Sequence, residues 1–189
     1  QVLDYAVLVI NGMDGVQSHT DTLWKLLKRY EIPTFIFVNK MDMDGADKDA
    51  IFQNIRKKLD GDCVDFSSGD RDEQIAMADE RLLDTYLDTG MVETEDIIEA
   101  ILDRKIFPCF WGSVQELLDA MNTYMVMLAY NAEFGGRIFK ISRDAKGERL
   151  TYMKVTGGSL KCREQIEGTE AKVNQIRIYS GARYETVEE

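Results

Sequence analysis

The stretch at residues 34–42 constrains the fold most strongly, because an apolar run there ends abruptly in polar side chains. The run reads Thr-Phe-Ile-Phe-Val over residues 34–38. A short, continuous run of this kind is typical of a strand that is buried on both faces, as in a parallel sheet. Asn39, Lys40, Met41 and Asp42 follow it directly. Because ligands of open α/β sheets bind beyond the carboxyl ends of the strands, this tetrad (residues 39–42) is a candidate binding loop.

The first 134 residues alternate between strand and helix patterns. Apolar runs at residues 5–10 and 106–111 predict two more strands, and the composition of the first also predicts that it is buried. Apolar residues recur at helical spacing between the strands. They predict a helix capped by Ser18, helices over residues 47–59 and 72–89, a helix capped by Thr94 that runs through residue 103, and a helix that opens at residues 114–121. Such alternation predicts a parallel sheet with helices on both faces.

From Gly135 onward the apolar period changes to two, which is typical of half-buried strands. Residues 137–142 and 150–156 predict a hairpin with a turn at residues 144–147, and residues 172–179 predict a further strand. The charge changes at the same place: residues 1–134 carry a net charge of −14, and residues 135–189 carry +3. The sequence therefore predicts two domains, 1–134 and 135–189, of which the second is all-β.

The composition excludes several classes of protein. Hydrophobic residues make up 44 % of the chain, enough for a packed core, and no apolar run approaches the roughly 20 residues that cross a bilayer. The first residues lack the basic segment of a signal peptide. Cys63, Cys109 and Cys162 have neither metal-ligand nor redox spacing, so we expect reduced thiols in a cytosolic protein with no membrane partner.

The mildly basic second domain leaves two interpretations open. It could face nucleic acid, or its cations could belong to a solvated surface. The candidate basic residues are Lys154, Lys161, Arg163, Arg177 and Arg183.

The tetrad has the Asn-Lys-x-Asp pattern that GTP-binding proteins use to recognise guanine. The edge of guanine offers two adjacent donors, and the ionised carboxylate of Asp42 can accept both in a charge-assisted, bidentate pair. Lys40 can lay its apolar stem over the base, and Asn39 can contact the base and tie neighbouring loops together. The alternative is a charged loop in which Asn39 and Asp42 act only as local caps.

A guanine site also needs a second loop, and Gly112-Ser113 follows the strand predicted at residues 106–111. Gly-Ser alone is also compatible with an ordinary turn. The phosphate-binding pattern G-x-x-x-x-G-K-[ST] does not occur in the sequence, so the chain supplies only part of a nucleotide site. The single histidine, His19, has no partners at ligand spacing, and we expect it at a helix entry rather than at a metal.

Several segments together resemble the translational GTPases of the elongation-factor-G-like group, and within it the tetracycline-resistance ribosomal protection proteins. The resemblance covers nearly the whole chain. The segments that carry it are residues 15–20, 22–24, 32–42, 137–140 and 150–161.

The resemblance implies the C-terminal half of a G domain of the P-loop GTPase type at residues 1–134, followed by part of an antiparallel β-barrel at residues 135–189. It implies GTP or GDP as ligand, held at the guanine by Asn39, Lys40, Asp42 and Ser113. The residues that bind Mg²⁺ and the catalytic residues would lie in parts of the parent protein that precede Gln1. The chain alone is then not expected to hydrolyse GTP.

The resemblance also implies partners and a cellular role. The parent would be a cytoplasmic, ribosome-dependent GTPase whose barrel abuts small-subunit RNA and whose GTP cycle releases tetracycline from the ribosome. The alternatives are a housekeeping elongation factor, a release-factor-type GTPase and a non-hydrolytic ribosome-binding homologue. The chain departs from the family where Val114 directly follows Ser113, without the usual alanine and short loop, and where residues 165–172 look shortened.

Overall fold

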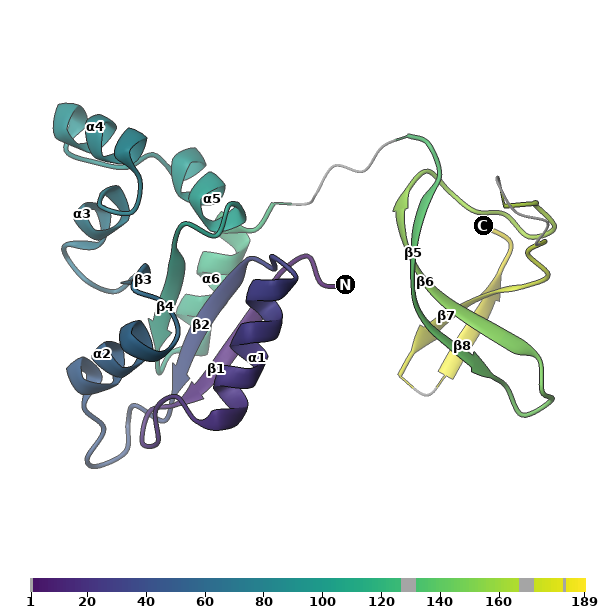
Figure 1. The fold of residues 1–189 in the computed structure, drawn as a ribbon, viewed down its shortest axis with the longest axis horizontal. Coiled ribbons are helices and arrows are strands. Elements are labelled where there is room, and N and C mark those ends of the chain that lie inside the picture. Colours follow the sequence, from purple (N-terminus) through teal and green to yellow (C-terminus); the bar gives the residue numbers. More distant parts are fainter. Residues whose placement is uncertain (1, 127–131, 167–171, 182) are drawn as a thin grey trace. The chain divides into compact units, whose positions relative to one another are not determined.

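The computed structural model describes residues 2–126, 132–166, 172–181 and 183–189, and the chain divides into two compact units (Figure 1). One unit comprises Leu3–Met127, and the other comprises Leu128–Glu189 together with Gln1–Val2. The first is mixed α/β and the second is built from antiparallel strand pairs, as the sequence predicted. No helix in the described part of the chain is long and apolar enough to cross a membrane.

The α/β unit contains one parallel sheet with the strand order β1-β2-β4-β3. Because all four strands run in the same direction, the loops after them meet at one edge of the sheet. Its elements are β1 (Ala6–Asn11), α1 (Ser18–Arg29), β2 (Thr34–Asn39), α2 (Lys48–Lys58), β3 (Cys63–Asp65), α3 (Arg71–Ala76), α4 (Glu80–Thr89), α5 (Thr94–Leu102), β4 (Phe107–Trp111) and α6 (Val114–Tyr124).

Two apolar cores cover the two faces of this sheet. On one face, Trp24 of α1 and Ile55 of α2 pack against inward residues of the strands such as Ile36. On the other face, helices α3 to α6 contribute a second cluster that includes Ile101 and packs against β2 residues such as Phe35. Strand β2 therefore has helices on both sides, and its buried apolar run follows from that position.

Strand β1 is less buried than its composition predicts. It forms one end of the strand order, and its residues alternate between buried and exposed. Leu8 and Ile10 join the core beneath α1, but Val7 and Val9 are 37 % and 57 % exposed. The strand predicted at residues 5–10 is present, but the prediction that it is buried holds for only one of its faces, because the face with Val7 and Val9 is open to solvent.

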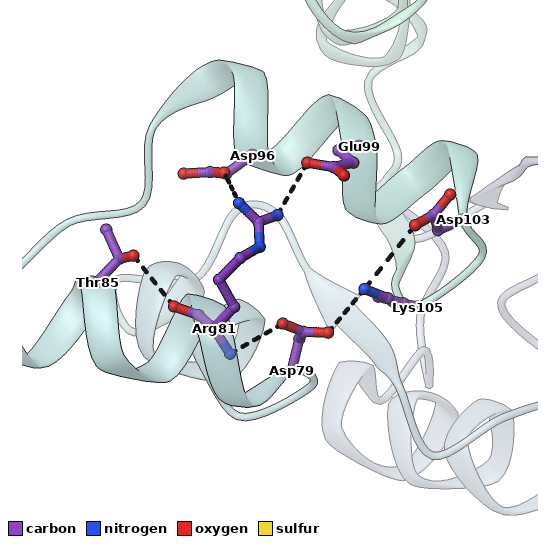
Figure 2. Close-up of polar contacts among 7 residues, drawn as sticks. All are labelled: Asp79, Arg81, Thr85, Asp96, Glu99, Asp103 and Lys105. Atoms are coloured by element: carbon purple, nitrogen blue, oxygen red, sulfur yellow. Dashed lines mark hydrogen bonds and ion pairs between the residues drawn. The ribbon is translucent and has the colours of Figure 1, made fainter.

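The helix predicted over residues 72–89 is in fact two helices, α3 and α4. The break falls at Asp79, whose side chain accepts a hydrogen bond from the Arg81 amide at 3.0 Å and so caps α4. The other carboxylate oxygen of Asp79 lies 2.7 Å from the ammonium of Lys105. Arg81 in turn binds Asp96 and Glu99 of α5 at 2.8 and 2.9 Å (Figure 2). A local cap therefore begins this helix, and ion pairs to Lys105 and α5 add to it.

Other helix boundaries differ from the predictions by one or a few residues. Ser18 and Thr94 are the first residues of α1 and α5 rather than their caps, which are Gln17 and Glu93. Neither cap makes a side-chain hydrogen bond. Strand β3, which is only three residues long, carries no recognisable pattern and was not predicted.

The second unit consists of two antiparallel pairs, β5 (Gly135–Arg143) with β6 (Arg149–Gly157) and β7 (Ile176–Ser180) with β8 (Arg183–Val187). The hairpin predicted between the first two strands is confirmed. Asp144 closes its turn by accepting from the amides of Lys146 and Glu148, at 2.9 and 3.0 Å. The strand predicted at residues 172–179 begins only at Ile176, and β8 was not predicted.

Candidate functional site

The tetrad lies at the carboxyl end of β2, on the edge of the sheet where the loops gather. Asn39 is the last residue of the strand and pairs in register with Asn11 of β1. Lys40 has a φ of 63°, in the left-handed region that residues with a β-carbon seldom adopt. Such a conformation turns the chain sharply out of the strand, so that residues 40 and 42 are exposed while Met41 is partly buried.

The loop that follows β1 supports the tetrad from one side. The Gly12 amide donates to the backbone carbonyl of Asn39 at 2.8 Å. A β-carbon on Gly12 would lie 2.5 Å from the sulfur of Met41 and 3.0 Å from the Asn39 carbonyl oxygen. A side chain at position 12 would therefore displace the Met41 side chain and crowd the Asn39 carbonyl, which glycine avoids.

The loop that follows β4 supports the tetrad from the other side. The Gly112 amide donates to the Val38 carbonyl at 2.9 Å, and Gly112 has a φ of 70°. Ser113 then caps α6, because its hydroxyl accepts from the Glu116 amide at 3.3 Å. Val114 is the first helical residue, so the loop between β4 and α6 consists of Gly112 and Ser113 alone.

The structure therefore brings the four predicted guanine-site residues onto two adjoining loops. The side chain of Met41 lies between these loops, since a β-carbon on Gly112 would contact the β-carbon of Met41 at 3.7 Å. Asn39 ends β2, Lys40 and Asp42 lie on the loop that follows it, and Ser113 lies on the second loop as the N-cap of α6.

The carboxylate of Asp42 has no hydrogen bond or ion pair with any residue that the structure describes, and the residue is exposed. It does not cap α2, because Asp47 accepts from the Ala50 amide at 3.0 Å and fills that role. Asn39 does make a local contact, since its side-chain oxygen accepts from the Lys40 amide at 2.8 Å. The backbone of Asn39, rather than its side chain, provides the link to the β1 loop.

A polar cluster beside the two loops was not predicted. Asp65, at the end of β3, is only 6 % exposed, and one of its carboxylate oxygens accepts from the Trp111 indole at 2.8 Å. The same oxygen accepts from the amide and hydroxyl of Ser67 at 3.0 and 2.7 Å. The other oxygen lies 2.6 Å from the ammonium of Lys48, the first residue of α2. No sequence spacing signals this cluster, because its members come from three separate elements.

Asp65 is held in its ionised form. Burial by itself would raise the pKa of its carboxyl group, but the hydrogen bonds from Lys48, Ser67 and Trp111 outweigh that effect and lower the pKa below its usual value. A buried carboxylate is tolerated when charged and neutral donors satisfy it in this way.

Helix α2 also holds the loop that follows β1. The Val16 amide donates to the side-chain oxygen of Asn54 at 3.0 Å, and the Val16 carbonyl accepts from the ammonium of Lys58 at 2.8 Å. Gly15, with a φ of 65°, leaves room for Asn54, because a β-carbon there would lie 2.9 Å from its side-chain oxygen. Contacts from α2 thus fix both the β1 loop and the Asp65 cluster.

The described residues include no group of three or more His, Cys, Asp or Glu side chains that could hold a metal ion. His19 is exposed in the first turn of α1, at the helix entry where the sequence placed it. The free thiols of Cys63 and Cys109 are buried, and that of Cys162 is partly buried.

The cations of the second unit are partly engaged with acidic residues. Arg177 lies 3.4 Å from the Asp144 carboxylate, and Lys161 lies 3.6 Å from Glu189. A row of aromatic rings runs beside Arg177, with neighbouring centroids 5.3 to 6.2 Å apart. The row consists of Phe139, Tyr152, Tyr179 and Tyr184.

The fold and the tetrad are typical of the GTP-binding class of α/β proteins. The family model for the elongation factor Tu GTP binding domain matches residues 1–177. The chain therefore belongs to the elongation factor Tu GTP-binding domain family, whose members bind guanine nucleotides.

Curated relatives in this family include several tetracycline resistance proteins. The chain is 30 % identical to TetP of Clostridium perfringens over 198 residues, which cover 87 % of the chain and 30 % of TetP. It is 28 % identical to TetW of Butyrivibrio fibrisolvens over 208 residues, covering 95 % of the chain and 33 % of TetW. It is 26 % identical to TetM from transposon Tn1545 of Enterococcus faecalis over 206 residues, which cover 95 % of the chain and 32 % of TetM. The chain thus spans about a third of the length of these relatives.

A solved structure confirms the fold. The crystal structure of ttk003000868 from Thermus thermophilus matches with a TM-score of 0.70 and 19 % identity, covering 99 % of this chain and 37 % of that one.

Proposed function

We propose that Asn39, Lys40, Asp42 and Ser113 form the guanine-binding part of a ribosome-dependent translational GTPase. The exposed Asp42 carboxylate carries this proposal, because no described residue satisfies it although it sits where three loops converge. Guanine presents two adjacent donors that would bind this acceptor, whereas adenine would leave it unpaired. Lys40 would cover one face of the base with its methylene stem.

The phosphates, Mg²⁺ and the hydrolytic residues belong, in this proposal, to another part of the complete protein. When bound, Mg²⁺ would neutralise charge that develops on the phosphates during hydrolysis. The residues of this chain would bind and orient the base, and so hold the nucleotide in position relative to the hydrolytic residues. The open apolar face of β1, with Val7 and Val9 exposed, is consistent with a further part of the G domain that packs there. By itself the chain would not turn over GTP.

The complete protein, we infer, is a cytoplasmic ribosomal protection factor that uses GTP hydrolysis to release tetracycline from the ribosome. The support is the similarity to TetP, TetW and TetM along most of the chain. Residues 1–134 would then be the C-terminal part of the G domain, and residues 135–189 the start of a β-barrel that contacts small-subunit RNA. The aromatic row and neighbouring cations of the second unit suit stacking and phosphate contacts with RNA.

The base-recognition role is tested by Asp42→Asn in the complete protein. The substitution replaces an acceptor with a donor, so we expect GDP affinity to fall by about a hundredfold or more and xanthosine diphosphate to become the preferred ligand. Competition between the two nucleotides for a fluorescent GDP analogue measures the change. Unchanged GDP affinity would show that Asp42 does not bind the guanine.

The cellular role needs a separate test. Expression of the complete gene in a tetracycline-susceptible host should raise tolerance to the drug, and the Asp42→Asn variant should not. If tolerance does not rise but ribosomes still stimulate GTP hydrolysis, a housekeeping elongation or release factor is the better assignment. If nucleotide binds without any ribosome-stimulated turnover, the protein is a non-hydrolytic ribosome-binding homologue.

A further inference from the structure

We propose that Asp65 is a positioning residue that holds the two guanine loops, residues 39–47 and 112–113, in a fixed relation to each other. The proposal rests on the guanine site described above and names a residue that no part of the Asn-Lys-x-Asp pattern includes. Asp65 itself lies on β3, outside both loops, and would not touch the nucleotide.

The first loop reaches Asp65 through Lys48. The loop that begins with the tetrad ends where α2 begins, and Lys48 is the first residue of that helix. Its ammonium lies 2.6 Å from the Asp65 carboxylate and donates to the Ser67 hydroxyl at 2.8 Å. The far end of the tetrad loop is thereby fixed to β3.

The second loop reaches Asp65 through Trp111. Trp111 is the last residue of β4, and Gly112 and Ser113 follow it immediately. Its indole nitrogen donates to Asp65 at 2.8 Å, and its ring packs edge-on against Phe52 of α2, with centroids 5.8 Å apart. The Lys48 ammonium also lies 5.1 Å from the centre of the Trp111 ring. One carboxylate thus joins the end of one loop to the start of the other.

Among the ion pairs of the described residues, Asp65 is the most buried acidic partner, although Arg177 and Asp144 also form a pair whose side chains are only 14 % and 15 % exposed. The Asp65 side chain is 9 % exposed, whereas Arg81 and Glu99 in the α4–α5 network are 54 % and 58 % exposed. Exposed pairs contribute little, but a buried carboxylate with four donors holds its partners in one geometry. Guanine recognition depends on two loops at fixed separation, so loosening this link should reduce discrimination between bases.

Three substitutions in the complete protein separate the two halves of the link. Asp65→Asn places an amide where Lys48 binds, and Lys48→Met removes the charge but keeps most of the stem. Trp111→Phe keeps the ring against Phe52 but removes the indole donor. Asp79→Asn is the matched control: it breaks a 2.7 Å ion pair to Lys105 and retains a capping oxygen, at a site on α4 away from both loops.

The readout is the ratio of affinities for GDP and inosine diphosphate, which lacks the exocyclic amine. We expect the wild-type protein to prefer GDP and Asp65→Asn to bind GDP about tenfold more weakly, with the preference for GDP lowered as well. Lys48→Met and Trp111→Phe should likewise lower the preference for GDP over inosine diphosphate. Lys48→Arg, which keeps the charge, should retain the wild-type preference. Asp79→Asn should leave the ratio unchanged, even if it lowers the melting temperature.

A wild-type preference for GDP that persists in Asp65→Asn and Lys48→Met would overturn the positioning role while leaving the guanine site intact. Because Lys48 is 41 % exposed, its variant should fold even if Asp65→Asn does not, and it alone can decide the matter. Absence of any GDP preference in the wild-type protein would instead overturn the guanine site, and the positioning role with it.

Discussion

Lys40 adopts a strained backbone conformation at the point where the chain turns out of β2 into the candidate binding loop. Its φ of 63° is costly for any residue with a β-carbon, by roughly 1 kcal/mol. Strained conformations of this kind persist where the surroundings impose them, and they concentrate at functional sites. The hydrogen bonds of Gly12 and Gly112 on either side of the tetrad supply such surroundings.

We predict that Lys40→Gly separates stability from binding. Glycine relieves the left-handed strain but loses more chain entropy on folding, so the free energy of unfolding should change by less than about 1 kcal/mol. GDP affinity of the complete protein should fall at least about fivefold, because the stem no longer covers the base. Lys40→Ala is the control: it should bind as weakly and also retain the strain. Urea unfolding and GDP titration check both parts, and full GDP affinity in Lys40→Gly would contradict the role of the stem.

At the scale of single residues, the sequence predicted those that carry a local pattern. Asn39, Lys40 and Asp42 are adjacent and directly follow a recognisable strand, so their position at the sheet edge could be inferred. Asp65 could not be found in this way, because its partners Lys48 and Trp111 lie 17 and 46 positions away and only the folded sheet brings them together. Whether the predicted residues bind guanine remains a prediction.

Among the elements, the segment that follows β6, next to the start of β5, tolerates a side chain least. Gly158 has a φ of 54°, and a β-carbon there would lie 2.8 Å from the Phe134 amide nitrogen and 2.9 Å from the Ala132 carbonyl oxygen. Both neighbours are backbone atoms and cannot move aside as a flexible side chain can. Gly147, in the β5–β6 turn, also has a positive φ of 82°, but nothing lies within 4 Å of a β-carbon built on it.

We therefore predict that Gly158→Ala destabilises the second unit by about 3 kcal/mol and that Gly147→Ala costs only about 1 kcal/mol. Urea titration followed by amide resonances of β5 to β8 measures both values. Equal losses in the two variants would show that backbone strain, rather than the close approach to residues 132–134, sets the cost. The difference between the variants is the quantity to compare, since both share the strain of a positive φ.

Element prediction succeeded where one strong pattern acted alone. Strand β2 was predicted from its continuous apolar run. The β5–β6 hairpin was predicted from two segments with a two-residue apolar period and the turn between them. The single helix predicted over residues 72–89 failed because Asp79 caps α4 and binds Lys105, a contact that the helical spacing does not encode. Strand β3 was missed because three residues are too few to show a period.

At the scale of the whole molecule, the chain combines two compact units whose sequence patterns differ. The change of period and charge near residue 135 predicts domains at residues 1–134 and 135–189, and these bounds remain a prediction. The described residues form an α/β unit and a unit of antiparallel strand pairs. The open face of β1 was not predicted, because composition alone does not reveal that this strand ends the strand order. In the function proposed above, a further part of the G domain packs on this open face of β1.

The central claim is that guanine binds at the carboxyl edge of the sheet, between the tetrad and the Ser113 loop. A crystal structure of the complete protein with GDP tests it most directly. We expect both oxygens of the Asp42 carboxylate to accept hydrogen bonds from the guanine edge at about 2.7–3.1 Å, with the Lys40 stem along one face of the base. A base bound away from residues 39–42, with Asp42 still turned to solvent, would contradict the account.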